Sequence, residues 1–252
     1  MKLIVTDLDR TLLRSDKSIS AYTIEILNRC RKAGYMIAFA TARAENGMVR
    51  FINALNPDAI ISSGGAVISL NGNIIYEKSM SASDVRTIIN MCTRFTAGKG
   101  KITAESIEGY FSNFIPDDPD RYNAFKYADF SRFDIPCYKI TAELEYDEYG
   151  EVIANMCDDC SVLSYSGELW QRFACKTSTK EDSLKVLLNH LKIDYTDVIA
   201  FGDDTNDIGM LKLAGTAVAV ANAIPKIKAI AHHITKSNDE DGVADYLHNY
   251  VL

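Results

Sequence analysis

Two carboxylates near the start of the chain have the spacing of a metal site. Asp7 and Asp9 lie one residue apart, so both side chains fall on the same side of an extended backbone. Holding two carboxylates close together costs free energy unless a cation lies between them. The pair therefore indicates a site for a hard metal ion, which prefers oxygen ligands. Two solvated aspartates in a loop after a strand would give the same pattern.

A second acidic cluster lies far along the chain, in Gly202-Asp203-Asp204-Thr205-Asn206-Asp207. It follows a short apolar run, 198–201, and precedes a helical stretch, 208–213. We expect Gly202 to let the chain turn tightly at the end of the strand, because glycine adopts backbone conformations that other residues avoid. The acids and the amide are then either ligands of a cation or a solvated loop that caps the following helix.

A hydroxyl group and an ammonium group occupy positions that suit a bound anion. Thr41 ends the apolar run 36–40, and its hydroxyl and the backbone N–H groups near Ala42 could hold a phosphate; a helix cap is the alternative. Lys180 falls in the first turn of a helix that Thr179 is expected to cap. A cation there opposes the helix dipole. Lys180 is therefore either an ordinary surface lysine or a group that converges with the helix N-terminus on one anion.

These side chains follow short apolar runs that alternate with helical stretches. The runs have the length and composition of buried parallel strands, and they cover 3–5, 36–40, 59–61, 198–201 and 216–220. A hairpin is predicted over 67–76, because Asn71-Gly72 favours a type I′ turn. Together they predict an α/β fold with a doubly wound, Rossmann-like parallel sheet, which binds ligands at the carboxyl ends of its strands.

The middle of the chain has a different pattern. A helix is predicted over 85–95, with Ser83 as its N-cap, and a second helix around 152–156. Alternating segments predict strands at 102–105, 110–114, 138–144, 162–165 and 169–175. Many strands and few helices are typical of an antiparallel sheet with helices on one face.

The two patterns divide the chain into two predicted domains. Residues 1–81 and 176–252 are expected to form the core domain, and the insert 82–175 a smaller α+β cap domain. Within the insert, the acidic, proline-bearing stretch 116–120 is expected to form a surface loop.

Charge and composition limit the partners that we expect. The 252-residue chain has a formal net charge of −7, which gives no general attraction to nucleic acid or to an acidic membrane. No charged-then-apolar leader is present, and no apolar run approaches the ~20 residues of a membrane span. We therefore expect a cytoplasmic location. An anionic substrate would need a locally positive site, built from a metal ion and a few cations.

The six cysteines are expected to be reduced thiols in such a location. Cys157 and Cys160 have the spacing of zinc ligands, and Cys137 and Cys175 could complete a set of four. The chain has no second Cys-x-x-Cys, which argues against zinc. A structural zinc and ordinary buried thiols nevertheless both remain open.

Taken in order, these positions resemble the four motifs of the haloacid dehalogenase (HAD) superfamily of phosphohydrolases. The resemblance covers nearly the whole chain. The matching residues are, in motif order, Asp7-x-Asp9-x-Thr11, Thr41, Lys180 and Gly202-Asp203-x-x-Asn206-Asp207. The strand-rich insert, with the tail segments 218–223 and 241–244, is similar to the Cof-type subgroup, which has a large α/β cap (subclass IIB).

The resemblance implies roles for these residues. Asp7 would attack phosphorus and form an aspartyl-phosphate, and Asp9 would protonate the leaving oxygen and then deprotonate water. Mg²⁺ would be held by Asp7, the backbone carbonyl of Asp9, and Asp203. Asp207 would belong to the same metal site, where it and Asn206 orient Lys180 and metal-bound water. The implied catalytic residues are Asp7, Asp9 and Lys180, and the implied phosphate-binding residues are Thr41, Ala42, Lys180 and Asn206.

The resemblance further implies a Mg²⁺-dependent phosphatase that acts on a small phosphorylated metabolite, such as a sugar phosphate or a phosphorylated cofactor. A non-catalytic phosphometabolite sensor and a sugar phosphomutase are the alternatives. The complete acidic set argues against a sensor, which could lose Asp9 without losing its ligand. A monomer and a homodimer both remain open.

Four residues depart from the family's usual motifs. None is expected to carry out the chemistry, so the departures bear on which substrate is used. They are Arg10 for a glycine in the first motif, Ala42 for a glycine in the second, Gly64 for an asparagine before Gly65, and Glu181 for a small residue beside Lys180.

Overall fold

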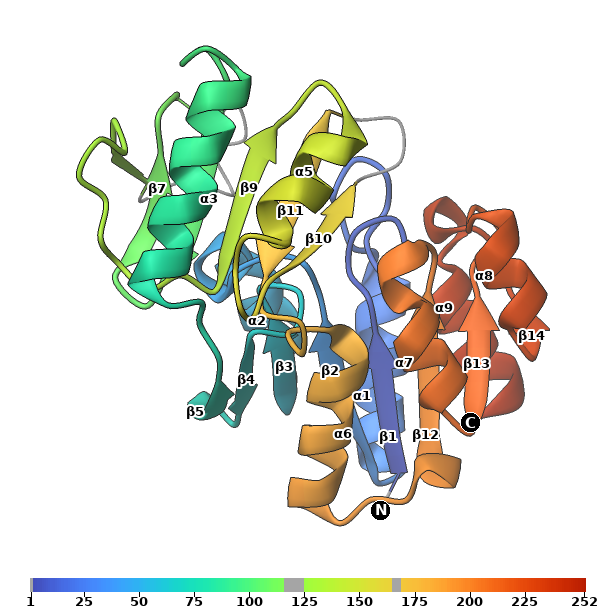
Figure 1. Cartoon of the computed structure of the whole chain (residues 1–252). Coiled ribbons are helices and arrows are strands. Elements are labelled where there is room, and N and C mark those ends of the chain that lie inside the picture. The colour runs from blue at the N-terminus through green and yellow to red at the C-terminus, as the bar shows by residue number, and fades with distance from the viewer. Residues whose placement is uncertain (1, 116–124, 165–168) are drawn as a thin grey trace. The chain divides into compact units, whose positions relative to one another are not determined.

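The computed structural model describes residues 2–115, 125–164 and 169–252. The chain divides into two compact units (Figure 1): Met1–Ala42, Val49–Tyr76 and Thr179–Leu252 form the first, and Arg43–Met48 and Glu77–Ser178 the second. The second unit contains the predicted insert 82–175 together with residues 43–48, 77–81 and 176–178, which the sequence assigned to the core. The predicted loop at 116–120 and the end of the predicted strand 162–165 at Tyr165 lie outside the described residues.

The first unit is built on an eight-stranded sheet with the order β14-β13-β12-β1-β2-β3-β4-β5. The strands from β14 to β3 are parallel to their neighbours, and β4 runs antiparallel to β3. Their bounds are β1 Lys2–Thr6, β2 Tyr35–Ala40, β3 Ala59–Ser62, β4 Val67–Leu70, β5 Asn73–Glu77, β12 Val198–Gly202, β13 Thr216–Ala219 and β14 His233–Ile234.

Helices cover both faces of this sheet. Helices α1 and α9 pack against each other on one face, and α6 and α7 pack against each other on the other (Figure 1). The helices of the unit are α1 Ala21–Lys32, α2 Val49–Leu55, α6 Lys180–Leu191, α7 Ile208–Leu213, α8 Pro225–Ile230 and α9 Gly242–Tyr250. The predicted α/β fold with a parallel-sheet core is therefore confirmed.

Strand β1 lies at the centre of the sheet because its side chains are apolar on both faces. Leu3, Ile4 and Val5 are fully buried, as a strand covered by helices on both sides requires. β1 pairs with β12 on one side and with β2 on the other, so the strand order reverses direction here. A doubly wound sheet binds its ligands at such a switch point, beyond the carboxyl ends of the strands.

Local sequence signals fix the ends of several elements. Ser20 accepts a hydrogen bond from the Thr23 N–H and starts α1. Asn71 and Gly72 both have positive φ, as the predicted type I′ turn requires. One cap was predicted wrongly: helix α3, Ala82–Phe95, is capped by Ser81 rather than by Ser83. Helix α2 was not predicted, because its seven residues are too few to show a clear apolar period.

The second unit is built on a six-stranded sheet with the order β10-β11-β9-β6-β7-β8. Its pairs are antiparallel except for β7 and β8, which run parallel. Its helix α5, Asp147–Ala154, begins earlier than the predicted stretch around 152–156. The strands are β6 Ile102–Ser106, β7 Gly109–Ser112, β8 Phe125–Tyr127, β9 Lys139–Glu143, β10 Ser161–Ser164 and β11 Trp170–Ala174.

One apolar core joins this sheet to its helices. Val85, Ile88 and Ile89 of α3 face alternate residues of the strands, among them Ile140 and Phe173, which are fully buried. The six cysteines of the chain are free and buried, and burial raises the pKa of Cys92 and Cys160 to about 12. Among the described residues no cysteine belongs to a group of metal-ligating atoms, so the geometry favours ordinary thiols over a zinc site.

The described ranges contain no helix with both the length and the apolar composition that crossing a membrane requires.

Gly65 permits the close approach of the loop after β3 to the start of α6. Its φ is +109°, and a Cβ at this position would lie 2.3 Å from the backbone oxygen of Thr179. The Ser183 hydroxyl donates to the Gly65 carbonyl at 2.5 Å, which fixes the loop to the helix. The position of α6, and with it that of Lys180, therefore depends on the absence of a side chain here.

We expect Gly65→Ala to lower the free energy of unfolding by about 3 kcal/mol or more, because a backbone clash adds to a left-handed conformation that costs about 1–2 kcal/mol. Gly72→Ala is the matched control: its φ is +77°, but no atom lies within 4 Å of the added Cβ. It should lose only about 1 kcal/mol. Urea denaturation measures both, and equal losses would show that the close approach is unimportant.

Candidate active site

Strand ends in the first unit bring four of the sequence-predicted site residues together. Asp7 directly follows β1, and its N–H donates to the carbonyl of Phe201 in β12. Asp203 directly follows β12, and Asp207 ends the short 3-10 helix η3, Thr205–Asp207. Lys180 is the first residue of α6, behind its N-cap Thr179. Residues far apart in the sequence therefore meet at one edge of the sheet.

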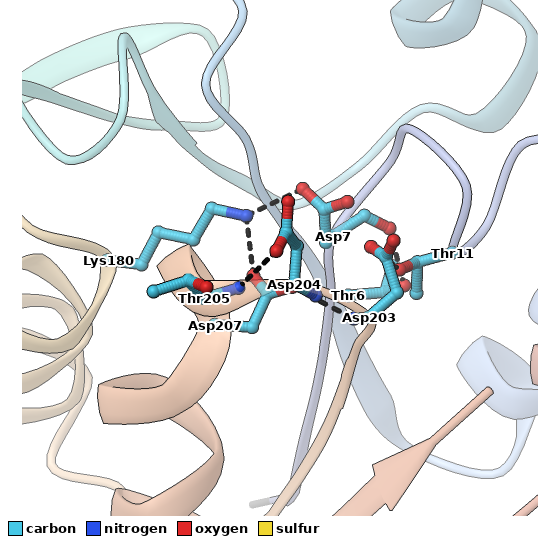
Figure 2. Close-up of polar contacts among 8 residues, drawn as sticks. All are labelled: Thr6, Asp7, Thr11, Lys180, Asp203, Asp204, Thr205 and Asp207. Carbon is cyan, nitrogen blue, oxygen red and sulfur yellow. Dashed lines mark hydrogen bonds and ion pairs between the residues drawn. The ribbon is translucent and has the colours of Figure 1, made fainter. Parts of the chain in front are cut away.

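The Lys180 ammonium bridges two carboxylates (Figure 2). Its Nζ lies 2.6 Å from Asp7 Oδ1 and 2.7 Å from Asp207 Oδ1. The Lys180 side chain is only 4% exposed, and the Asp207 side chain only 1%. Lys180 is therefore not an ordinary surface lysine. Before any ligand binds, its ammonium is already held by two buried anions.

Asp207 also folds back onto the backbone of its own loop. Its Oδ2 accepts hydrogen bonds from the N–H groups of Asp203, at 2.9 Å, and Asp204, at 3.2 Å. A Cβ on Gly202 would lie 2.6 Å from the Asp207 Cβ. Gly202 does not have a positive φ, so our expectation of a turn that only glycine can make was wrong. The glycine is needed because the Asp207 side chain occupies the space beside it.

Asp203 completes the buried acidic group. The Thr11 hydroxyl donates to Asp203 Oδ1 at 2.8 Å, which ties the first motif to the fourth (Figure 2). Carboxylate oxygens of Asp7, Asp203 and Asp207 all lie within 4.8 Å of one another. Of the described residues, these are the ones whose ligand atoms form such a group.

The electrostatics of the group follow from its burial. Burial raises the pKa of Asp7 well above its usual value, and the neighbouring Asp207 and Asp203 raise it further against the opposing effect of Lys180. Burial likewise raises the pKa of Asp203, to about 6. Burial alone would lower the pKa of Lys180, but Asp207 and Asp7 outweigh it and keep the ammonium charged.

Three carboxylates around one ammonium fit a divalent cation in both ligand type and charge. With all three ionised, the group carries −3 from the aspartates and +1 from Lys180, which leaves −2. Carboxylate oxygens are the ligands that hard divalent cations prefer. The site could therefore hold such an ion, whose charge would balance the group.

Asp9 lies apart from the three gathered carboxylates. Its Oδ1 accepts a hydrogen bond from Lys17 Nζ at 2.8 Å, and its side chain is 29% exposed. Lys17 was missed by the sequence reasoning, since a lysine in a polar loop carries no signal of its own. A short backbone bridge between Asp9 and Leu13 closes the loop in which Asp9 lies.

The predicted phosphate-binding residues lie at the same edge of the sheet. Thr41 follows β2, is fully buried, and exchanges backbone hydrogen bonds with Ile61 and Gly64. Ala42 comes next and is half-buried, and Asn206 is half-buried in η3. The backbone of Thr41 is thus held by β3 and by the loop that contains Gly64 and Gly65.

Two of the departures from the family motifs have clear backbone consequences. Arg10 has φ +60°, a conformation that the usual glycine would adopt without cost. Gly64 has φ +73°, which asparagine also tolerates. Ala42 does not lie in the left-handed region, so the lost glycine costs nothing there. The fourth, Glu181, fits beside Gly209, which has no side chain to meet it.

A family model for haloacid dehalogenase-like hydrolases matches residues 4–247 of the chain. The chain belongs to this family. The match spans both the N-terminal acidic motif and the fourth motif, and thus all four residues of the buried group. The HAD family assigned from the sequence motifs is therefore confirmed.

Relatives and solved structures align with nearly the whole length of this HAD hydrolase. The 5-amino-6-(5-phospho-D-ribitylamino)uracil phosphatase YitU of Bacillus subtilis is 25% identical, over 98% of this chain and 97% of its own. The crystal structure of a haloacid dehalogenase-like hydrolase from Bacteroides thetaiotaomicron is 26% identical and covers 98% of each chain, with a TM-score of 0.83.

The subclass IIB sugar phosphatase BT4131 shares the fold, with a TM-score of 0.86 at 21% identity over 99% of each chain. The Cof-type assignment and the enzyme class, a phosphatase of the HAD type, are thus confirmed.

We expect Asp203→Asn to stabilise the metal-free protein at neutral pH. A carboxyl whose pKa rises from 3.8 to about 6 on folding stabilises the folded state below pH 4, and this contribution is lost as the pH rises through 6. The neutral amide of asparagine does not have the free-energy cost of a buried negative charge. Its oxygen can still accept a hydrogen bond from the Thr11 hydroxyl.

Urea denaturation in EDTA should show the variant more stable by up to about 3 kcal/mol at pH 7.5 and equal to the parent at pH 4. Asp194→Asn is the control, since that exposed carboxyl lies outside the buried group. A variant that is less stable than the parent at pH 7.5 would contradict the unfavourable burial of Asp203.

Proposed function

We propose that this HAD phosphatase hydrolyses a small phosphorylated metabolite through an aspartyl-phosphate on Asp7, with Mg²⁺ as its cofactor. The observation that carries the proposal is the buried group itself. Lys180 holds one oxygen of Asp7, and Asp203 lies within 4.8 Å of the same side chain. A nucleophile held between an ammonium and a cation site has both the charge and the fixed orientation that phosphoryl transfer needs.

In the first step a carboxylate oxygen of Asp7 attacks phosphorus, and the bond from phosphorus to the leaving oxygen breaks. Asp9 gives its proton to that oxygen, so the product leaves as a neutral alcohol. In the second step Asp9 takes a proton from a water molecule, whose oxygen attacks phosphorus. The bond between phosphorus and Asp7 breaks, inorganic phosphate is released, and both carboxyl groups return to their starting states.

Cationic and hydrogen-bonding groups hold the transferring phosphoryl group in this proposal. Lys180 binds one of its oxygens, and Thr41, with the backbone near Ala42, binds another. Asp207 keeps Lys180 in place, as its 2.7 Å contact with the ammonium supports, and Asn206 lies on the same short helix. Removing one donor aimed at developing charge typically costs a factor of ~10²–10³ in rate.

Asp7, Asp203 and Asp207, with the backbone carbonyl of Asp9, are the proposed ligand set for Mg²⁺. When bound, the ion would neutralise negative charge on the phosphoryl oxygens and keep Asp7 ionised. The raised pKa of Asp7 supports this assignment, because its carboxylate needs more positive charge nearby than Lys180 alone supplies.

The named relatives support small phosphorylated substrates. YitU is named for a phosphorylated ribitylaminouracil, and BT4131 for sugar phosphates. We propose that the substrate is a sugar phosphate or a phosphorylated cofactor. Phosphate release from a panel of both would identify it. A phosphomutase would return an isomeric sugar phosphate in place of inorganic phosphate, so product analysis on the same panel separates the two activities.

We expect Asp7→Asn to abolish turnover of p-nitrophenyl phosphate in the presence of Mg²⁺, because an amide cannot form the phosphoenzyme. The loss should exceed ~10³-fold, the scale seen when a catalytic nucleophile is removed. Steady-state release of p-nitrophenol measures it. Asp194→Asn, on an exposed carboxyl outside the buried group, is the control and should keep full activity. Unchanged activity in Asp7→Asn would disprove the proposed nucleophile.

A further inference from the structure

The loop that follows the first motif returns to Asp9 through Lys17. Lys17 Nζ donates to Asp9 Oδ1 at 2.8 Å, across eight residues of chain. The backbone between them is closed by the Leu13 N–H donating to the Leu8 carbonyl at 2.8 Å. Lys17 itself has φ +65°, in the left-handed region. Lys17 is the left-handed residue of a turn in which its N–H donates to the Arg14 carbonyl at 2.8 Å and the Arg14 N–H donates to the Ser18 carbonyl at 3.1 Å. This turn directs the Lys17 ammonium to Asp9.

Stability alone does not account for this arrangement. The side chains of Lys17 and Asp9 are 43% and 29% exposed, and exposed ion pairs contribute about 0–1 kcal/mol. The left-handed backbone of Lys17 costs about 1–2 kcal/mol. That cost belongs to the turn, and the exposed contact itself adds little to stability.

The surrounding structure that fixes this loop comes from the far end of the chain. The Ser15 N–H and hydroxyl donate to the two oxygens of Asp239, each at 2.8 Å. The Arg14 guanidinium donates to both oxygens of Asp241, at 3.2 and 2.7 Å. The Asn238 side chain donates to the Leu13 carbonyl at 3.0 Å. The residues just before Lys17 are thus held by several side chains of the segment 238–241.

We propose that Lys17 is a positioning residue for Asp9, and that the segment 238–241 holds Lys17 in the place where it can act. By binding Oδ1, the ammonium fixes the rotation of the Asp9 carboxyl group, so that the group meets the leaving oxygen in one orientation. The inference rests on the proposed function, in which Asp9 gives its proton to that oxygen. Lys17 touches neither the substrate nor phosphorus.

The effect of misplacing Asp9 depends on the leaving group. As the bond from phosphorus to the leaving oxygen breaks, an alkoxide needs the proton of Asp9, whereas p-nitrophenolate leaves without one. A wrongly oriented Asp9 should therefore slow the first step, formation of the phosphoenzyme, for a sugar phosphate and spare that step for p-nitrophenyl phosphate. The second step, in which Asp9 takes a proton from water, is the same for both substrates, so the first step is compared through kcat/KM. Loss of a merely structural contact would slow both alike.

The experiment compares Lys17→Met with the parent on p-nitrophenyl phosphate and on the best alkyl phosphate of the substrate panel. We expect kcat/KM, which includes only the steps up to departure of the leaving group, to fall by ~10–100-fold for the alkyl phosphate and by less than ~3-fold for p-nitrophenyl phosphate. Lys17→Arg, which keeps a donor, should recover much of the loss. Lys185→Met removes an ion pair of similar exposure on α6 and should change neither substrate.

A second variant tests the support of the loop without touching the Lys17 side chain. Asp239→Asn combined with Asp241→Asn weakens the hold on Ser15 and Arg14. We expect the same selective loss on the alkyl phosphate, at a smaller size. Circular dichroism and thermal unfolding establish that each variant is folded.

Asp9→Asn, measured in parallel, separates the two proposals. If Asp9→Asn is selectively slow on the alkyl phosphate but Lys17→Met matches the parent, or is faster, the role of Lys17 is refuted and the proposed function stands. If Asp9→Asn itself shows no selective loss, the assigned role of Asp9 fails, and the inference about Lys17 fails with it.

Discussion

Three buried carboxylates share a single ammonium in this protein, and much of the fold serves to hold them there. Carboxylates at this distance repel one another, and each loses hydration on burial. The Lys180 ammonium offsets part of this cost through short contacts with Asp7, at 2.6 Å, and Asp207, at 2.7 Å. Such a group does not assemble by itself. A rigid framework must bring its members together against their mutual repulsion.

The framework is the centre of the parallel sheet. Fully buried β1 carries Asp7 to the edge, and β12 beside it carries Asp203. Gly202 leaves space for Asp207, whose second oxygen is held by backbone N–H groups. Gly65 lets the opposite loop approach Thr179, so that α6 starts where Lys180 can reach both acids. Both glycines leave room for a neighbouring group, and Gly65 in addition adopts a positive φ.

The excess negative charge connects stability with function. An arrangement of excess negative charge gains most from binding a cation. The raised pKa of Asp203 expresses this cost directly. The same cost makes the group selective, because a site short of two positive charges favours a divalent cation over a monovalent one. The fold therefore loses stability at the site where the chemistry needs a divalent cation.

The sequence predicted the elements of this site well, because each carries a strong local signal. The apolar run before Asp7 and the glycine-led acidic motif place their residues at strand ends, and Thr179 marks the start of α6. The resemblance to the family implied that Asp207 orients Lys180, but local sequence patterns alone could not show this contact between distant segments. They also could not show that Gly202 makes room for the Asp207 side chain, since that depends on how the loop folds back. The Lys17–Asp9 pair was not predicted, because residue type alone does not indicate the left-handed backbone conformation of Lys17. Helix α2 was not predicted because its seven residues are too few to show a clear apolar period. The cap of α3 was misplaced because Ser81 and Ser83 are both suitable N-cap residues.

The most direct test of the charge imbalance is an isothermal titration of Mg²⁺ into protein freed of metal by EDTA. The account predicts one Mg²⁺ per chain, with protons released as the buried acids ionise. It also predicts an affinity lower by at least ~10-fold in Asp203→Asn, the scale on which a lost ligand acts. Equal affinity in the parent and the variant, or no binding to the parent at all, would contradict the claim that these carboxylates await a divalent cation.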